Sequence, residues 1–280
     1  DYEHVDFYKN FENLENSFIK FIEKTPPTGK SIICIDNNNI KKIYKKIKNK
    51  NIITYGENVN SNYKISKIRY KTDYSIFDLS YLIAGNKIKK LKNIKLKLLG
   101  KHNVLNATAA VIACLNLGVH QNIIKKSLKN FTGVQRRMTK IFSRGRSDFY
   151  DDYAHHPTEI ESILDGINNV YQDKKIVSVF EPHRYSRVLS LKKKFAKSFS
   201  KSHLVILCPL YAASEKKDFR YKDDEFAKLI SKSSKTQVIV IKNFRELGRY
   251  FKKNLTDNQI IIGMGAGSIS KYMQELKNIL

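Results

Sequence analysis

Residues 148–162 read DFYDDYAHHPTEIES and join two different local patterns. The first half is rich in β-prone aromatic residues, whereas the second half begins a helical pattern that continues to residue 171. A strand that leads directly into a helix is the repeating unit of α/β proteins. The segment therefore predicts an α/β fold, with two aspartates, a tyrosine and two adjacent histidines where a strand ends.

The same alternation of short apolar runs and helical patterns continues to the C-terminus. We expect strands at residues 147–153, 175–182, 203–211, 236–242 and 259–265. We expect helices at residues 157–171, 189–201, 223–233, 244–254 and 268–280. A doubly wound, Rossmann-like parallel sheet of about six strands, with five or six crossover helices, fits this order.

The first half of the chain has a different order of expected strands and helices. We expect strands at residues 31–35 and 51–56, and helices at residues 38–49, 102–116 and 121–130. Between them, residues 63–71, 75–85 and 87–100 alternate apolar and polar side chains, which predicts a hairpin meander that turns at Gly85 and Asn86. The pattern of strands and helices changes near residues 132–135. This change predicts two domains, residues 1–133 and 134–280.

Composition narrows the classes of function. A net charge of +26 would indicate nucleic-acid binding if the basic residues gathered on one face, but the lysines are spread from Lys9 to Lys277. No window offers the ~18 consecutive apolar residues of a membrane helix. Cys34, Cys114 and Cys208 lie in apolar runs without a C-x-x-C pair, which favours buried, reduced thiols. These features predict a cytoplasmic protein that binds neither membrane nor nucleic acid.

Three turns at the carboxyl ends of expected strands are candidate ligand segments, because ligands of such sheets bind there. The first is the opening segment. The second, FEPHRYSR at residues 180–187, contains His183, Arg184 and Arg187, and the two arginines could present their planar guanidinium groups to one carboxylate or phosphate. The third, GMGAGS at residues 263–268, has Ser268 where a dinucleotide fingerprint requires glycine, so close packing is favoured over nucleotide binding.

The opening segment contains several titratable groups. Asp151 and Asp152 alternate along a strand, so one carboxylate is expected to face the ligand crevice and the other to face away. His155 and His156 should diverge, so a zinc site would need a further Cys or His nearby. Tyr153 and one of the histidines suit contact with an anionic substrate.

A simpler explanation covers Thr158 and Glu161. Their spacing fits the S/T-x-x-E capping box, in which each side chain satisfies a backbone N–H at the start of a helix. Helix initiation therefore explains both residues without a catalytic role.

Five segments together resemble the Mur ligase family, the ATP-dependent amide ligases of peptidoglycan synthesis. They are GKHNVLNATAA, GVQRRM, DDYAHHPTE, EPHRYSR and GMGAGSIS, in the family's order and approximate spacing. The EPHRYSR segment resembles the branch that joins L-alanine to UDP-N-acetylmuramate; a branch that attaches a peptide is the alternative. The resemblance implies that residues 1–133 are the C-terminal part of the central ATP-binding domain, and that residues 134–280 are the C-terminal Rossmann-like ligase domain.

The resemblance also implies a reaction and a substrate site. In this family ATP phosphorylates the lactyl carboxylate, and the amino group of L-alanine attacks the resulting acyl phosphate, so cations must balance the accumulated charge. Arg184 and Arg187 match positions that hold the muramyl substrate. Tyr153, His155 and His183 match the lining of the same pocket, with His155, Arg184 and Arg187 nearest the chemistry.

For ATP, the resemblance implies a second group of residues. His102, Asn103 and Asn106 match the adenine side, and the two asparagine amides, three residues apart on a helix, can offer paired donors and acceptors to one base edge. Helix capping is an alternative role for Asn103. Arg137 matches an arginine that reaches ATP from the C-terminal domain, and Asp152 matches the carboxylate that binds the ribose hydroxyls.

His4 matches a histidine that helps to hold Mg²⁺ near the phosphates; without the resemblance it would be taken as an exposed histidine. Two positions depart from the family pattern, with Met138 in place of an aromatic residue and Ala154 in place of a glycine. The family's UDP-binding domain, its P-loop and its acidic Mg²⁺ ligand would lie upstream of Asp1. We therefore expect residues 1–280 to be a fragment that needs the missing N-terminal part of the same enzyme for activity.

Overall fold

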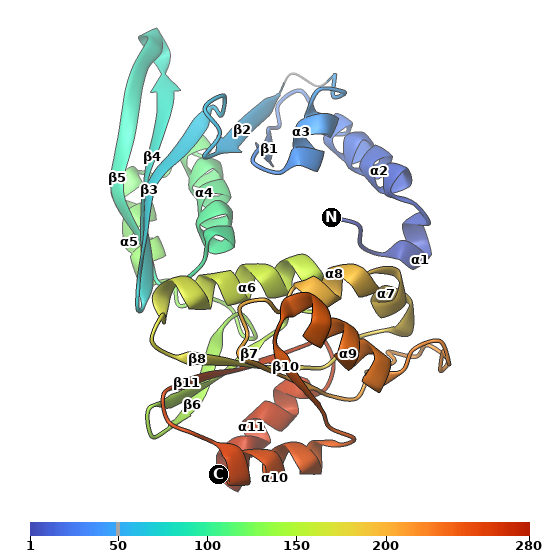
Figure 1. Cartoon of the computed structure of the whole chain (residues 1–280). Coiled ribbons are helices and arrows are strands. Elements are labelled where there is room, and N and C mark those ends of the chain that lie inside the picture. The colour runs from blue at the N-terminus through green and yellow to red at the C-terminus, as the bar shows by residue number, and fades with distance from the viewer. Residues whose placement is uncertain (49–50) are drawn as a thin grey trace. The chain divides into compact units, whose positions relative to one another are not determined.

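The computed structural model describes residues 1–48 and 51–280, and the chain divides into two compact units, Asp1–Gly133 and Val134–Leu280 (Figure 1). The helix expected at residues 38–49 begins as predicted but ends at Tyr44, and its last expected residue lies outside the described residues. Within the described ranges, no helix has the length and apolar character needed to cross a membrane. Cys208 is buried, whereas Cys34 and Cys114 are partly exposed, which corrects the expectation of three buried thiols.

The first unit is a mixed sheet with helices packed against it in two separate apolar clusters. Its elements are α1 (Val5–Tyr8), α2 (Phe11–Glu23), β1 (Ser31–Cys34), α3 (Asn38–Tyr44), β2 (Ile52–Gly56), β3 (Tyr63–Lys71), β4 (Tyr74–Ile83), η1 (Ala84–Asn86), β5 (Lys87–Leu96), α4 (Lys101–Asn116) and α5 (Gln121–Asn130). In the described part of this unit the strand order is β1-β2-β3-β4-β5. The first three strands run parallel, and β3, β4 and β5 form the expected antiparallel meander.

Alternation along the meander places one row of side chains in the core. Phe77 and Leu79 of β4 are fully buried, and they belong to the same apolar cluster as Val104 and Val111 of α4. Burial of side chains of this size stabilises a fold by about 2 kcal/mol each. The meander and α4 therefore form one packed body, which fixes the position of both ends of α4.

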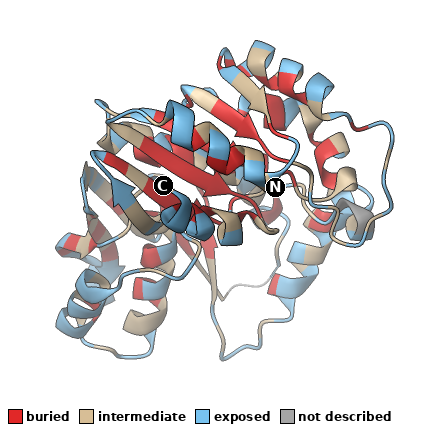
Figure 2. Ribbon diagram, turned by 90° about the horizontal axis from the view of Figure 1, so that it is seen from below, coloured by how far each residue is buried: buried red, intermediate tan, exposed pale blue. Residues whose placement is uncertain are grey.

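The second unit is a sheet covered on both faces. Its elements are β6 (Thr139–Arg144), β7 (Ser147–Asp152), α6 (Pro157–Val170), β8 (Lys175–Phe180), α7 (Tyr185–Ser190), α8 (Lys192–Lys197), β9 (Leu204–Leu207), α9 (Asp223–Ser234), β10 (Gln237–Val240), α10 (Phe244–Asn254), β11 (Gln259–Met264) and α11 (Ile269–Ile279). Residues of α6, α8 and α9 pack in one apolar cluster, and residues of α10 and α11 in another. Figure 2 shows mostly buried strands beside helices that alternate buried and exposed residues.

The strand order of this fully described unit is β10-β9-β8-β11-β7-β6. All neighbours are parallel except β6, which pairs antiparallel with β7. The doubly wound architecture is thus confirmed, but the expectation of an entirely parallel sheet is wrong at this edge. The single helix expected at residues 189–201 is also wrong, since α7 and α8 meet at Leu191 and replace it.

The last strand of the chain brings the three candidate turns together. β11 lies between β7 and β8, and its Met264 is level with both Asp152 and Phe180. The turns that follow these three residues therefore start side by side at the carboxyl edge of the sheet. Two backbone hydrogen bonds hold them there, from Gly265 N to Asp152 O at 3.3 Å and from Glu181 N to Met264 O at 2.9 Å. Such an edge is the usual ligand site of doubly wound sheets.

Helix α6 begins with a capping box, but at different residues from those expected. His156 is the N-cap, and its side chain accepts a hydrogen bond from the N–H of Thr158. Glu159 accepts hydrogen bonds from the N–H groups of His155 and His156 at 3.0 and 3.1 Å. The expected box of Thr158 and Glu161 is wrong because the helix starts at Pro157, two residues before Glu159, where it would start if Thr158 were the cap.

Glu159→Ala is expected to lower the unfolding free energy by about 1 kcal/mol, because two N–H groups lose their acceptor. Urea unfolding followed by circular dichroism measures the change. Glu161→Ala is the matched control on the same helix and should change the unfolding free energy by less than about 0.5 kcal/mol. Equal losses for the two variants would contradict the assigned box.

Candidate functional site

Three aromatic rings line the carboxyl edge of β7 and β8. The rings of Tyr153 and His155 lie 5.0 Å apart, and those of His155 and His183 lie 5.9 Å apart, measured between centroids. His183 in turn stacks on Tyr211 at 5.5 Å with an interplanar angle of 12°. The structure therefore brings the three ring residues expected from the sequence into one row. Tyr211 was not among the expected site residues.

His183 has a defined tautomer. Its Nδ1 lies 2.9 Å from Nη1 of Arg187, and because a guanidinium group can only donate, Nδ1 must accept. The neutral ring therefore carries its proton on Nε2. Burial, with the positive charge of Arg187 as the next cause, lowers the pKa of His183 to about 4. At neutral pH this ring is an uncharged hydrogen-bond donor.

His155 has the opposite tautomer. Its Nδ1 lies 2.8 Å from the carbonyl oxygen of Tyr153, which can only accept, so Nδ1 carries the proton. The carboxylate of Glu159 lies 3.4 Å from the same nitrogen and favours this orientation. The Nε2 atom of His155 is consequently left as an acceptor. The row of rings thus offers one acceptor and one donor.

The two arginines of the second turn have different environments. Arg187 is buried to 8% exposure in the first turn of α7, and its guanidinium group also contacts the carbonyl oxygen of His183 at 3.2 Å. Arg184 precedes the helix with φ 67, a left-handed conformation that is unfavourable for a side chain with a Cβ. Its positive charge contributes to the lowered pKa of His183, which places it in the same cluster.

Arg136 connects the first and third turns, although no sequence pattern singles it out apart from the neighbouring Arg137. Its Nη2 donates to Gly265 O at 2.6 Å, and its Nε lies 3.7 Å from a carboxylate oxygen of Asp151. Its guanidinium carbon lies 4.7 Å from the centre of the Tyr153 ring, and its carbonyl oxygen accepts the N–H of Tyr153 at 2.8 Å. Arg136 therefore positions Tyr153.

Asp151 and Asp152 are both buried, at 3% and 0% exposure, so the expectation that one carboxylate faces an open crevice is wrong. Asp151 accepts a hydrogen bond from Ser270 Oγ at 2.5 Å. Asp152 accepts from the N–H groups of Met138 and Ala154 at 2.7 and 2.8 Å, and burial raises its pKa to about 6. Asp152 thus fixes the turn that carries Arg137, and a contact with ribose would require this turn to open.

Arg137 lies beside the row of rings. Its Nη1 is 3.7 Å from Glu159, its guanidinium carbon is 5.9 Å from the centre of the Tyr153 ring, and its side chain is 49% exposed. Because this cation is half-exposed, it is able to contact an anion. Its expected contact with ATP stays a prediction.

The expected adenine-side residues lie in the first turns of α4. Asn103 donates from its side chain to Leu99 O at 2.7 Å, so its amide ties the helix start to the preceding loop, and the N-cap is Gly100 rather than Asn103. Asn106 is exposed one turn further along, whereas His102 is partly buried. The contact of these side chains with adenine stays a prediction.

His4 is exposed and has φ 51, and its carbonyl oxygen accepts the N–H groups that begin α1. No cluster of three or more histidine, cysteine or acidic side chains suited to a metal ion occurs among the described residues. Mg²⁺ prefers oxygen ligands in octahedral geometry, so one exposed imidazole does not fit it. The donors of the described residues do not form a Mg²⁺ site.

Acid is expected to destabilise the fold through His183. Its pKa of about 4 lies below the ordinary value of 6.5. Between these two pH values His183 binds a proton in the unfolded chain but stays neutral in the folded protein. The unfolding free energy should therefore fall as the pH drops from about 6.5 to about 4, by about 1 kcal/mol after allowance for solvent screening. Urea unfolding at several pH values measures this loss.

His183→Asn is the informative variant, because its side-chain oxygen can still accept from Arg187 but does not titrate. The slope of the unfolding free energy against pH should become shallower in this variant. Asp152 titrates in the same window with the opposite sign, since its pKa is raised, but it is present in both proteins and cancels in the difference. An unchanged slope would contradict the neutral state assigned to His183.

Comparisons with known proteins find relatives along the whole chain. Residues 1–114 match the Mur ligase middle domain, and residues 136–267 match the domain described as Mur ligase, glutamate ligase domain. The chain is 45% identical over 280 residues to the UDP-N-acetylmuramate–L-alanine ligase of Pelagibacter ubique, covering all of this chain and 60% of that protein. It is 36% identical to the corresponding ligase of Ruthia magnifica, covering 99% of this chain and 59% of that protein.

The crystal structure of the UDP-N-acetylmuramate–alanine ligase of Thermotoga maritima superimposes with a TM-score of 0.73 at 23% identity, covering 99% of this chain and 56% of that one. The crystal structure of a murein peptide ligase from Psychrobacter arcticus superimposes with a TM-score of 0.65 at 20% identity. At this identity both structures support the fold alone. The chain spans about 60% of the length of the curated relatives described above. The two matched domains together establish that the chain belongs to the Mur ligase family.

Proposed function

We propose that the chain forms the middle and C-terminal part of an ATP-dependent ligase that joins L-alanine to the lactyl carboxylate of UDP-N-acetylmuramate. The similarity to alanine ligases over the whole chain supports this substrate pair. The observation that carries the proposal is the row of rings with opposite tautomers, His155 as acceptor and His183 as donor, next to Arg184 and Arg187.

The proposed reaction needs both a hydrogen-bond acceptor and a hydrogen-bond donor. ATP first transfers its terminal phosphoryl group to the carboxylate, which creates a phosphate leaving group. The ammonium group of L-alanine must then lose a proton before its nitrogen can attack the acyl carbon. We assign Nε2 of His155 as the acceptor of a proton from this ammonium group. Nitrogen–carbon bond formation then gives a tetrahedral oxyanion, and breakage of the carbon–oxygen bond releases phosphate, which takes the second proton that the nitrogen loses as it becomes an amide.

The cations stabilise the negative charge that gathers at this step. Fixed donors aimed at a developing oxyanion contribute about 3 kcal/mol each to transition-state stabilisation. We assign this role to Arg184 and to Nε2–H of His183, which Arg187 orients. Arg137 is assigned to ATP, as are His102, Asn103 and Asn106 on the first unit. The reaction would be cytoplasmic, as expected from the reduced thiols.

A hybrid protein tests the proposal. Residues 1–280 replace the matching 60% of the Pelagibacter ubique ligase, and phosphate release is measured with ATP, UDP-N-acetylmuramate and an amino acid. We expect release that depends on L-alanine. Release with a murein tripeptide but not with L-alanine would support the peptide-attaching alternative and overturn the proposed substrate. A folded hybrid that releases no phosphate with either would overturn ligation itself.

A further inference from the structure

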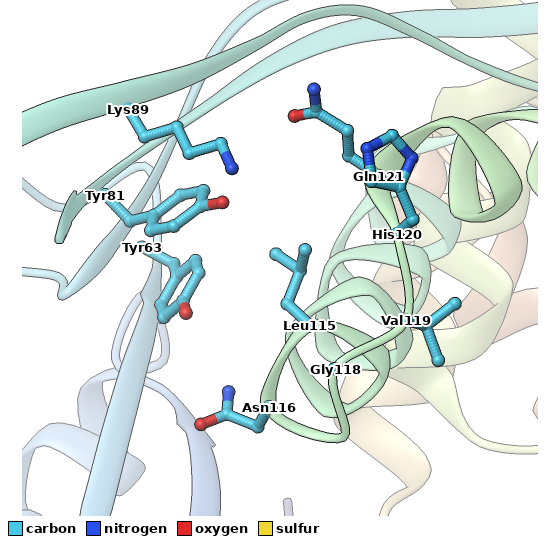
Figure 3. A pocket seen from close by; sticks show the side chains of 9 residues that line it. All are labelled: Tyr63, Tyr81, Lys89, Leu115, Asn116, Gly118, Val119, His120 and Gln121. Carbon is cyan, nitrogen blue, oxygen red and sulfur yellow. The ribbon is translucent and has the colours of Figure 1, made fainter.

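A pocket of about 310 Å³ lies within the first unit, at the opposite end of α4 from the expected adenine contacts (Figure 3). Its lining comes from the meander, the last turn of α4 and the start of α5. Asn116 in this lining is ten residues beyond Asn106, which corresponds to about 15 Å along a helix axis. The pocket is therefore separate from the residues assigned to ligation.

One wall of the pocket is aromatic. Tyr63 and Tyr81 face each other across β3 and β4, and their rings stack with centroids 4.6 Å apart and an interplanar angle of 22°. Burial raises the pKa of both phenols, so they stay protonated, and the nearby Asn116 side chain partly offsets this rise for Tyr63. Figure 3 shows Leu115 across the pocket from the two rings. A flat apolar group fits between such walls.

The rim is rich in donors. Lys89 lies opposite Tyr81 in the β4–β5 pairing, so its ammonium group is on the same face of the sheet. It forms no salt bridge with any described residue. His120 accepts the N–H of Asn122 at its Nδ1, so the neutral ring has its proton on Nε2 as a further donor. No aspartate or glutamate lines the pocket.

We propose that this pocket binds a small planar carboxylate, with its flat apolar part between the Tyr81 ring and Leu115 and its carboxylate at the Lys89 ammonium. A cation without an acidic partner, together with further donors, selects an anion. The aromatic and aliphatic walls select a flat apolar body rather than a bare inorganic ion. The inference rests on the first unit alone and is independent of the proposed ligation.

Benzoate is a suitable probe. Titration into the 280-residue chain, followed by NMR of the backbone and side-chain amides, should give saturable shifts at Asn116 and Gln121. Lys89→Met should weaken benzoate binding at least about fivefold, since it removes a close opposite charge. Lys90→Met is the matched control: it removes the same charge from the next residue of β5, which pairs with Ser80 and projects from the other face of the sheet. Its benzoate affinity should stay within about twofold of wild type.

Two neutral or inorganic probes complete the test. Benzyl alcohol should bind more weakly than benzoate, and equally to both variants, because it lacks the charge. Inorganic phosphate should not displace benzoate. Equal losses in the Lys89 and Lys90 variants, displacement by phosphate, or shifts that do not saturate would each overturn the proposal, because binding would then reflect the general positive charge of the surface.

Discussion

Arg184→Gly is expected to lower ligation by the hybrid protein about a hundredfold or more, while the unfolding free energy stays within about 1 kcal/mol of wild type. The loss follows from removing a cation that acts where negative charge develops. Stability is preserved because Arg184 has φ 67, a conformation that glycine adopts without strain. Relief of that strain offsets the lost contacts of the side chain. Phosphate release and urea unfolding measure the two quantities.

Arg184→Ala separates the two effects. Alanine also removes the guanidinium group but keeps the strained backbone, so its ligation rate should match that of the glycine variant and its stability should be lower. A strained non-glycine residue at a strand-end turn is typical of functional sites. Full ligation by either variant would contradict the role of Arg184 and would leave the strain unexplained.

The parts of the site that were predicted from the sequence depend on local patterns. Apolar runs separated by helical segments located β7, β8 and β11, and the rule that ligands bind at the carboxyl ends of parallel strands located the three turns. Close packing at the glycine turn is confirmed, because a Cβ on Gly267 would lie 2.5 Å from Oε2 of Glu181. These features follow from periodicity and from residue size, both of which a single sequence records.

The parts that were missed depend on register. Arg136 reaches Gly265, 129 residues away, only because β11 inserts between β7 and β8. Tyr211 stacks on His183 because the segment after β9 pairs with the turn after β8. No local pattern encodes either contact. The start of α6 was predicted correctly, but its capping box was assigned to the wrong residues because His156 is an unusual N-cap, whereas Thr158 is a common one.

Strand β6 was missed for a related reason. Its residues are partly or fully exposed, and its pairing with β7 shifts register between Lys140 and Phe142, so it shows neither a buried run nor a clean alternation. An edge strand pairs with only one neighbour, so its own sequence specifies its position weakly. Its position follows instead from the buried β7 beside it, including the Phe142–Phe149 stack at 4.2 Å.

Gly267→Ala is expected to lower the unfolding free energy by about 2 kcal/mol and to reduce ligation by about tenfold or more. The new Cβ would lie 2.5 Å from Cγ and 2.8 Å from Cδ2 of Tyr211, at the base of a ring that cannot swing aside without leaving His183. A displaced ring would release His183 from its stack and misplace the Nε2 donor. Urea unfolding and phosphate release by the hybrid report the two effects.

A double-mutant cycle identifies the clash. With Tyr211→Ala in place, Gly267→Ala should cost less than half as much stability, because the ring is gone and only the contact with the Glu181 carboxylate remains. Ligation should not recover in the double variant, since His183 still lacks its stacking partner. An unchanged stability cost would show that Tyr211 is not the obstacle. Recovery of ligation would show that the stack does not position His183, and the donor would then depend on Arg187 alone.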